Sequence, residues 1–255
     1  METVRDEYVE SLHVRVFSTR EEMGRQAGLE AADSIRRALA EKAQINVMFA
    51  AASSQNEMLQ TLCGAEDIPW ERVHAFHMDE YIGLDKDSPA GFANFLRDRI
   101  FDRLPFGAVY LLDGNAEPEE KAERYEKLLA ANPLDICLLG VGENGHLAFN
   151  DPPVADFADR RSVKIVELEE TCRLQQVHDG CFARIDQVPT HALTVTIPAL
   201  TAAKKMICTV PGAAKASAVE RMLRGAVETA CPASILRRHS DAVLYVDAAA
   251  AGRIL

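Results

Sequence analysis

The chain has 255 residues, 48% of them apolar and 26% charged, so it is long enough to bury a globular core without disulfide or metal staples. Its 39 acidic and 28 basic residues give a formal net charge of −11, which argues against binding nucleic acid or anionic membranes. No apolar run approaches the roughly 18 residues of a membrane span, and the N-terminus lacks a signal-peptide pattern. Since the six cysteines also lack paired spacing, we expect a reduced, cytoplasmic protein.

Short apolar runs alternate with helical patterns along most of the chain. The first run, Leu12–Phe17, is typical of a strand, and Ser18 and Glu21 have capping-box spacing for a helix that reaches about Lys42. Further strands are predicted at 45–50, 72–78, 108–113, 136–140, 163–168, 192–197, 205–210 and 242–246, and further helices at 57–63, 91–103, 118–131, 169–177 and 212–224.

This alternation predicts a three-layer α/β/α fold, in which helices cover both faces of a mostly parallel, Rossmann-like sheet. No linker rich in Pro, Gly or Ser divides the chain, so residues 1–255 are expected to form a single domain. Ligands of such sheets bind beyond the carboxyl ends of the strands. Three predicted strand ends carry unusual polar residues and mark the candidate site: 51–56, 78–81 and 140–151.

The segment 140–145, GVGENG, matches the GxGxxG pattern of dinucleotide sites, and Glu167 lies at a distance suited to a ribose-binding acid. That fingerprint requires a helix that begins among the glycines and meets the pyrophosphate. Pro152 and Pro153 follow so soon that no crossover helix fits, which disfavours a nucleotide. Glycines that merely allow a tight turn after the strand are the simpler structural alternative.

The same loop brings an amide, an imidazole and a carboxylate within eight positions: Asn144, His146 and Asp151. A carboxylate can orient and support a histidine that acts as an acid or a base. The alternative is a histidine that is only solvated or bonded to a backbone group.

Asp79 and Glu80 follow another apolar strand directly. In an extended chain, neighbouring side chains point in opposite directions, so only one of these carboxylates can face a cleft. That carboxylate is a candidate general base, and the other would hold a loop or a backbone amide. A solvated acidic turn is the structural alternative.

Taken together, MDEY at 78–81 and GVGENGHLAFNDP at 140–152 resemble the glucosamine-6-phosphate deaminase (isomerase) family. The resemblance continues through LDGN at 112–115, VPTHALT at 188–194 and PGAAK at 211–215, and it spans roughly residues 45 to 250. The family shares its fold with the 6-phosphogluconolactonases, whose glycine–histidine loop typically continues with Thr-Ala-Ser. The LAFN sequence found here favours the deaminase branch.

The resemblance implies conversion of an amino-sugar 6-phosphate to the ketose phosphate and ammonia, without a metal or an organic cofactor. It assigns opening of the sugar ring to His146 supported by Asp151, and transfer of hydrogen from C2 to C1 to Asp79. Asn144 completes the catalytic candidates, at a position where the family often has Asp.

For the phosphate, the family usually has a Thr-Gly-Gly-Thr-Pro loop, whereas segment 53–57 of this chain reads SSQNE. Hydroxyls and helix N-terminal amides remain, although Glu57 adds a negative charge. Lys215 matches the family's phosphate lysine, and Arg173 lies in the segment that carries its phosphate arginine. The substrate-binding candidates are therefore Ser53, Ser54, Gln55, Glu80, Lys215 and Arg173.

Three alternatives remain: a lactonase of the same fold, a regulator that binds sugar phosphate without turnover, and a metal site. The last would use His178, Cys181, His191, Cys231 and His239, which lack compact ligand spacing. The expected partner is a small-molecule sugar phosphate rather than nucleic acid or membrane, and a homo-oligomer is compatible with the sequence.

Overall fold

An eight-stranded sheet forms the centre of the protein, of which the computed structural model describes residues 3–115 and 117–255. Neighbouring strands pair in parallel except the first two, which pair antiparallel at one edge. The mostly parallel sheet predicted from the sequence is therefore confirmed. In spatial order the strands are β1 (Thr3–Val9), β2 (Leu12–Phe17), β11 (Ala242–Asp247), β10 (Lys205–Val210), β7 (Ile136–Leu139), β3 (Ile45–Phe49), β4 (Val73–His77) and β6 (Ala108–Tyr110).

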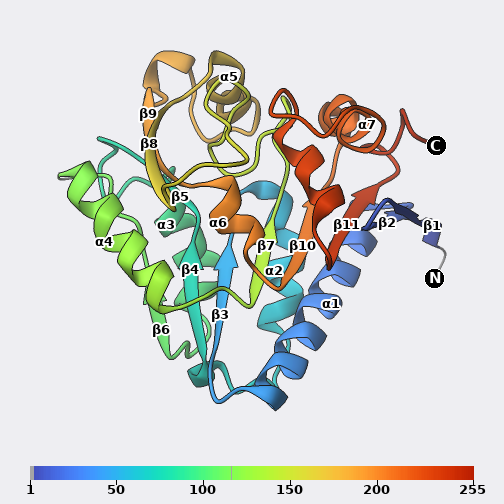
Figure 1. Ribbon diagram of the computed structural model, residues 1–255, viewed down its shortest axis with the longest axis horizontal. Helices are drawn as coiled ribbons and strands as arrows, with labels where there is room; N and C mark the ends of the chain where they lie inside the picture. The colour runs from blue at the N-terminus through green and yellow to red at the C-terminus, as the bar shows by residue number, and fades with distance from the viewer. Residues whose placement is uncertain (1–2, 116) are drawn as a thin grey trace.

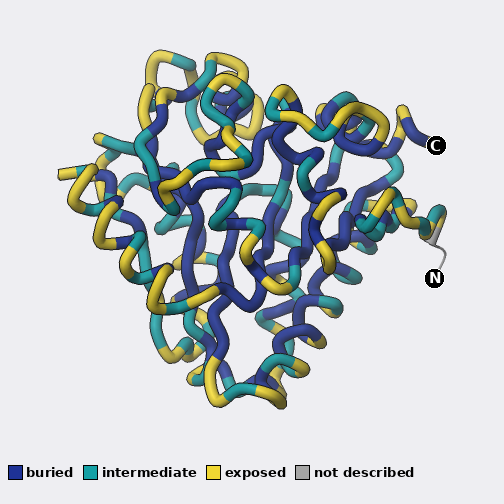
Figure 2. The backbone as a smooth tube through the Cα atoms, in the orientation of Figure 1, coloured by how far each residue is buried: buried dark blue, intermediate teal, exposed yellow. Residues whose placement is uncertain are grey.

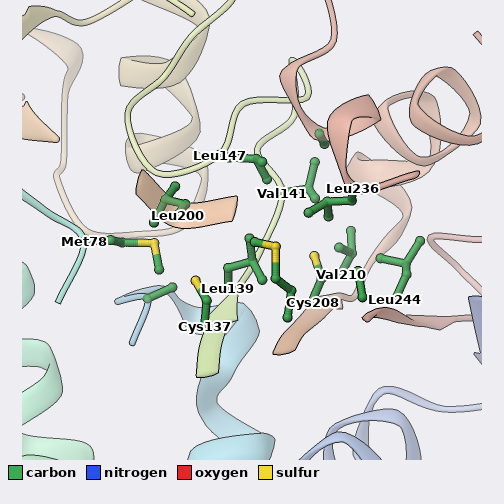
Figure 3. Close-up of a cluster of buried hydrophobic side chains, with 14 of the residues drawn as sticks. Met78, Cys137, Leu139, Val141, Leu147, Leu200, Cys208, Val210, Leu236 and Leu244 are labelled. Atoms are coloured by element: carbon green, nitrogen blue, oxygen red, sulfur yellow. The ribbon is translucent and has the colours of Figure 1, made fainter. Parts of the chain in front are cut away.

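Helices pack on both faces of this sheet and give the expected three layers (Figure 1). Met48 of β3 belongs to the core on one face, whereas its neighbour Phe49 belongs to the core on the other. The central strands are buried along their length (Figure 2), and Figure 3 shows Leu139, Cys208 and Leu200 in the first core. That core is covered by α4 (Pro118–Ala131), α6 (Ile197–Thr201) and α7 (Ala216–Arg224), and the second by α1 (Arg20–Glu41), α2 (Asn56–Cys63) and α3 (Phe92–Leu96).

A second sheet of three antiparallel strands lies with α5 (Glu170–His178) beyond the carboxyl ends of the central strands (Figure 1). It contains β5 (Asp79–Tyr81), β9 (His191–Val195) and β8 (Val163–Glu167), in that order. The strands predicted at 163–168 and 192–197 belong here and not to the parallel sheet, which corrects the prediction. Apolar alternation indicates that a strand forms, but it does not specify the partner strand.

The first helix begins one residue later than its predicted capping box. Thr19, and not Ser18, is the N-cap of α1, and its hydroxyl accepts a hydrogen bond of 3.2 Å from the amide of Glu22. Thr19 and Glu22 repeat the capping spacing one position further along. The sequence therefore contained two overlapping capping signals, and the structure uses the second.

Two other helices are shorter than predicted. The helix expected over 91–103 ends as α3 at Leu96 and continues as a π-helical turn, Arg97–Phe101. The helix expected over 212–224 begins only at Ala216, because Gly212 has a φ of +93° and a 3₁₀ turn, Ala213–Lys215, comes first. Among the described residues, no helix has both the length and the apolar character needed to cross a membrane.

Candidate active site

A cavity of about 270 Å³ lies beyond the carboxyl ends of β3, β4, β7 and β10. Segments 50–54, 78–79, 140–143 and 211–215, which follow these four strands, form most of its wall. The three polar strand ends singled out in the sequence therefore do converge. No helix occurs across residues 140–162, all of which are described, so the GVGENG segment lacks the crossover helix of a dinucleotide site.

Asp79 opens β5, pairs with Thr194 of β9, and lines the cavity with only 7% of its surface exposed. Burial, together with the negative charge of Glu80 beside it, raises the pKa of this carboxyl well above its usual range. A carboxylate in such surroundings is a stronger base than one in water, and it can also hold a proton between two transfers.

Glu80 points away from the cavity, as expected of a neighbour in an extended strand. Its carboxylate accepts hydrogen bonds from the amides of Phe92 (3.1 Å) and Ala93 (2.9 Å) at the start of α3. Burial acts to raise its pKa, but the nearby imidazole of His77 and these two amides hold the pKa below its ordinary value. Glu80 therefore anchors α3, and it does not line the cavity as a substrate-binding residue would.

His146 lines the cavity from the loop after β7, and Asp151 lies behind it. Nδ1 of His146 is 2.9 Å from Oδ1 of Asp151, an ion-pair distance, although the ring is not aligned for a full hydrogen bond. Burial alone would raise the pKa of Asp151, but His146 and Asn144 lower it, so the carboxylate stays ionised. Gly142 is required beside this ring, because a Cβ there would overlap its atoms.

Asn144 does not line the cavity but organises the loop around this pair. Its Nδ2 donates hydrogen bonds to Asp151 (2.9 Å) and Glu169 (2.6 Å), and its Oδ1 accepts one from the amide of His146 (3.0 Å). The amide of Glu169 donates to the second oxygen of Asp151 at 3.2 Å. Asn144 is therefore a positioning residue for the acid–base pair.

Cys172, which sequence reasoning missed, is buried against the same pair. Its sulfur and the ligand atoms of His146 and Asp151 lie within 4.8 Å of one another. Burial, followed by the charges of Asp151 and Asp79, raises the pKa of the thiol well above its usual range, and a protonated thiol is a poor metal ligand. This cluster includes none of the five scattered His and Cys residues considered as metal ligands.

Lys215 is the buried cation of the cavity. The residue is only 8% exposed, and its Nζ has no hydrogen-bond partner. Burial lowers its pKa, although the charges of Asp179 and Glu143 act in the opposite direction. A buried ammonium without a partner is costly, and an anionic ligand in the cavity would remove that cost.

The remaining predicted ligands divide between the cavity and the protein interior. Ser53 and Ser54 line the cavity. Gln55 is fully buried and donates to the hydroxyl of Thr209 at 2.8 Å, so it anchors the loop to β10 instead. Arg173 also lies outside the lining, because its guanidinium donates to the carbonyls of Ile185 (2.7 Å) and Val188 (2.9 Å).

Several charged or amide side chains of the lining were not predicted, among them Arg20, Gln176 and Asp179. Arg20 begins α1, more than 30 positions before the serine loop, and no local motif marks it. Gln176 lies in the last turn of α5 and Asp179 is its C-cap, and this helix follows β8 of the small antiparallel sheet. Only the tertiary arrangement brings these three to the site.

Comparison with known proteins identifies the class of protein to which this chain belongs. Residues 18–245 match the family model described as glucosamine-6-phosphate isomerases/6-phosphogluconolactonase. The chain belongs to this family. The deaminase-type motifs quoted from the sequence lie within the matched region.

Proteins named glucosamine-6-phosphate deaminase from Bacillus thuringiensis (strain Al Hakam) and Bacillus anthracis (strain A0248) are each 39% identical to this chain over 177 residues. The match covers 69% of this chain and 66% of each relative, slightly less than two thirds of their length.

Two solved structures are similar across almost the whole chain. A monomeric glucosamine-6-phosphate deaminase superposes with a TM-score of 0.84 at 30% identity, covering 94% of this chain and 99% of its own. A 6-phosphogluconolactonase from Thermotoga maritima superposes with a TM-score of 0.76 at 20% identity, covering 92% and 99%. The second likeness concerns the fold alone.

Proposed function

We propose that this protein converts glucosamine 6-phosphate, or a closely related hexosamine 6-phosphate, to the matching ketose phosphate and ammonia. The observation that carries this proposal is the pair of proton-transfer groups on one cavity: the buried carboxyl of Asp79, and His146 supported by Asp151. The identity to proteins named as deaminases supports the same reaction.

The proposed reaction needs two kinds of proton transfer. His146 delivers a proton to the ring oxygen and so opens the sugar, while Asp151 stabilises the charged imidazole. Asp79 then takes the hydrogen from C2 and returns it to C1. Water adds to the resulting imine at C2, and ammonia leaves.

The phosphate would bind at the end of the cavity formed by the serine loop and the start of α7. Lys215 supplies a buried positive charge there, and Ser53 and Ser54 supply hydroxyls. A charge-assisted contact to phosphate is among the stronger hydrogen bonds of proteins. The cavity therefore suits a sugar with an anionic end.

A lactonase of the same fold is the second candidate, supported by the likeness to a 6-phosphogluconolactonase. Hydrolysis of a sugar-phosphate lactone needs no group that moves a proton from C2 to C1. The buried Asp79 thus favours the deaminase. A regulator that binds sugar phosphate without turnover, a cytoplasmic location and a homo-oligomer remain predictions.

One assay tests both reaction and substrate. The protein is incubated with glucosamine, galactosamine and mannosamine 6-phosphates, and with 6-phosphogluconolactone, while ammonia and acid release are followed. We expect ammonia from at least one amino sugar. Acid release from the lactone without ammonia would favour the lactonase, and saturable binding without either product would favour the regulator.

A further inference from the structure

The cavity has a cationic side chain, Arg20, that none of the sequence motifs marks. Arg173, the arginine expected near the phosphate, donates its hydrogen bonds to backbone carbonyls outside the lining. Within the described lining, Arg20 and Lys215 are the Lys or Arg side chains present. Acidic side chains, among them Glu143 and Asp179, line the same space and disfavour an anion, so a second cation beside Lys215 would favour anion binding there.

Arg20 reaches the cavity because α1 packs unusually closely on α2. A Cβ on Gly24 would overlap the Cβ of Glu57. One turn further along, a Cβ on Gly28 would overlap the side chain of Thr61. Residues four apart lie on the same face of a helix, so Arg20 is carried to the start of α2 by the contact that Gly24 permits.

Two contacts then hold the guanidinium of Arg20 in place. Its Nε donates to Oε1 of Glu57 at 2.8 Å, and its Nη2 donates to the carbonyl of Ser53. These bonds use two of the five N–H groups of an arginine, and within the described residues the other three have no acceptor. The charge of Glu57, which the sequence placed near a phosphate, is thus already paired with a cation.

We infer that Arg20 supplies the second cationic contact to the phosphate of the substrate, in the role that sequence similarity gives to Arg173, and that Glu57 positions it. This inference rests on the proposed function, since it assumes a phosphorylated ligand. Arg20 begins α1 and Lys215 follows β10, so the two cations reach the anion from different elements. With Nε bonded to Glu57 and one N–H of Nη2 bonded to Ser53, the remaining N–H groups of the guanidinium still lie in one plane, an arrangement that suits phosphate oxygens.

The test compares Arg20→Gln with Arg36→Gln. Arg36 lies on the same helix, carries the same charge and pairs with Asp33 and Asp67 away from the cavity. Binding of inorganic phosphate is measured by calorimetry, and KM is measured for the phosphorylated amino sugar. Because Arg20 is 36% exposed, we expect Arg20→Gln to weaken both by about 5- to 50-fold, and Arg36→Gln to leave both unchanged.

Unchanged phosphate affinity in Arg20→Gln would overturn the inference, and ammonia release by the wild-type protein would then still support the proposed function. If the wild-type protein releases no ammonia but Arg20→Gln still weakens phosphate binding, the result supports the anion site and contradicts the proposed reaction. Should Arg20→Gln fail to fold by circular dichroism, Arg20→Lys provides the test. It keeps the charge but loses the planar set of donors, so an intermediate loss of affinity supports the inference and wild-type affinity contradicts it.

Discussion

His146 and Asp151 approach to 2.9 Å between Nδ1 and Oδ1, on either side of a tight turn that a bridge between Leu147 and Asn150 closes. The backbone makes this contact possible, since Gly145 has a φ of +92° and Gly142 leaves room for the ring. The pair therefore depends on loop geometry as much as on the two side chains. The third group of the proposed reaction, Asp79, lies on β5 of the small sheet, whereas the loop of His146 follows β7 of the central sheet.

Asp79→Asn should reduce turnover of the amino-sugar phosphate by about 10²- to 10⁴-fold while leaving its binding nearly intact, because the change removes the base and preserves the shape. The measurement is exchange of the C2 hydrogen with solvent, followed by NMR, beside a binding titration. Exchange at the wild-type rate in Asp79→Asn would contradict the role of Asp79.

His146→Gln should impair the cyclic substrate much more than an open-chain aldehyde analogue, because only the cyclic form must be opened. Asp151→Asn should show the same pattern more mildly, since the histidine remains but loses its charged support. Steady-state rates with both substrates provide the comparison. Equal losses on the two substrates would remove His146 from the ring-opening step.

Lys215→Ala should raise KM for the phosphorylated sugar by roughly 10- to 150-fold, the range expected when a charge-assisted contact worth about 1.5–3 kcal/mol is lost. The unphosphorylated sugar serves as the control, and its weaker binding should change little. An equal effect on both sugars, or on neither, would show that the anion site lies elsewhere.

Asp79→Asn should also stabilise the protein at neutral pH. Because the pKa of Asp79 is raised on folding, its contribution to stability is full below the unfolded-state pKa and is lost as the pH rises through the folded-state pKa. Asparagine resembles the protonated carboxyl at every pH. The thermal midpoint of the variant should exceed that of the wild type near pH 7, by about 2–4 °C for each kcal/mol gained.

The same comparison at acidic pH provides its control. Below the ordinary range of an aspartate pKa, both proteins are neutral at this position, so the two midpoints should converge. A difference that stays constant with pH would show that the asparagine acts through packing and not through the buried charge.

The sequence by itself determined the layered fold and the core of the candidate site. The βα alternation predicted the parallel sheet, and strand ends of parallel sheets meet at one edge, so Asp79 and His146 could be expected on one cavity. The opposite directions of Asp79 and Glu80 also followed from strand geometry alone. Each of these predictions rests on local information, namely the periodicity of apolar residues or the spacing of residues a few positions apart.

Only the tertiary structure decided which residues complete the cavity. Arg20 depends on the glycine-mediated contact between α1 and α2. Asp179 follows α5, which comes after a strand of the small antiparallel sheet, whereas the sequence predicted that strand as part of the parallel sheet. Gln55 and Arg173 lie in the expected segments, yet their side chains turn to buried backbone and hydroxyl groups. Such outcomes follow from the need of every buried polar group for a partner, and the partner is chosen by contacts between segments far apart in the chain.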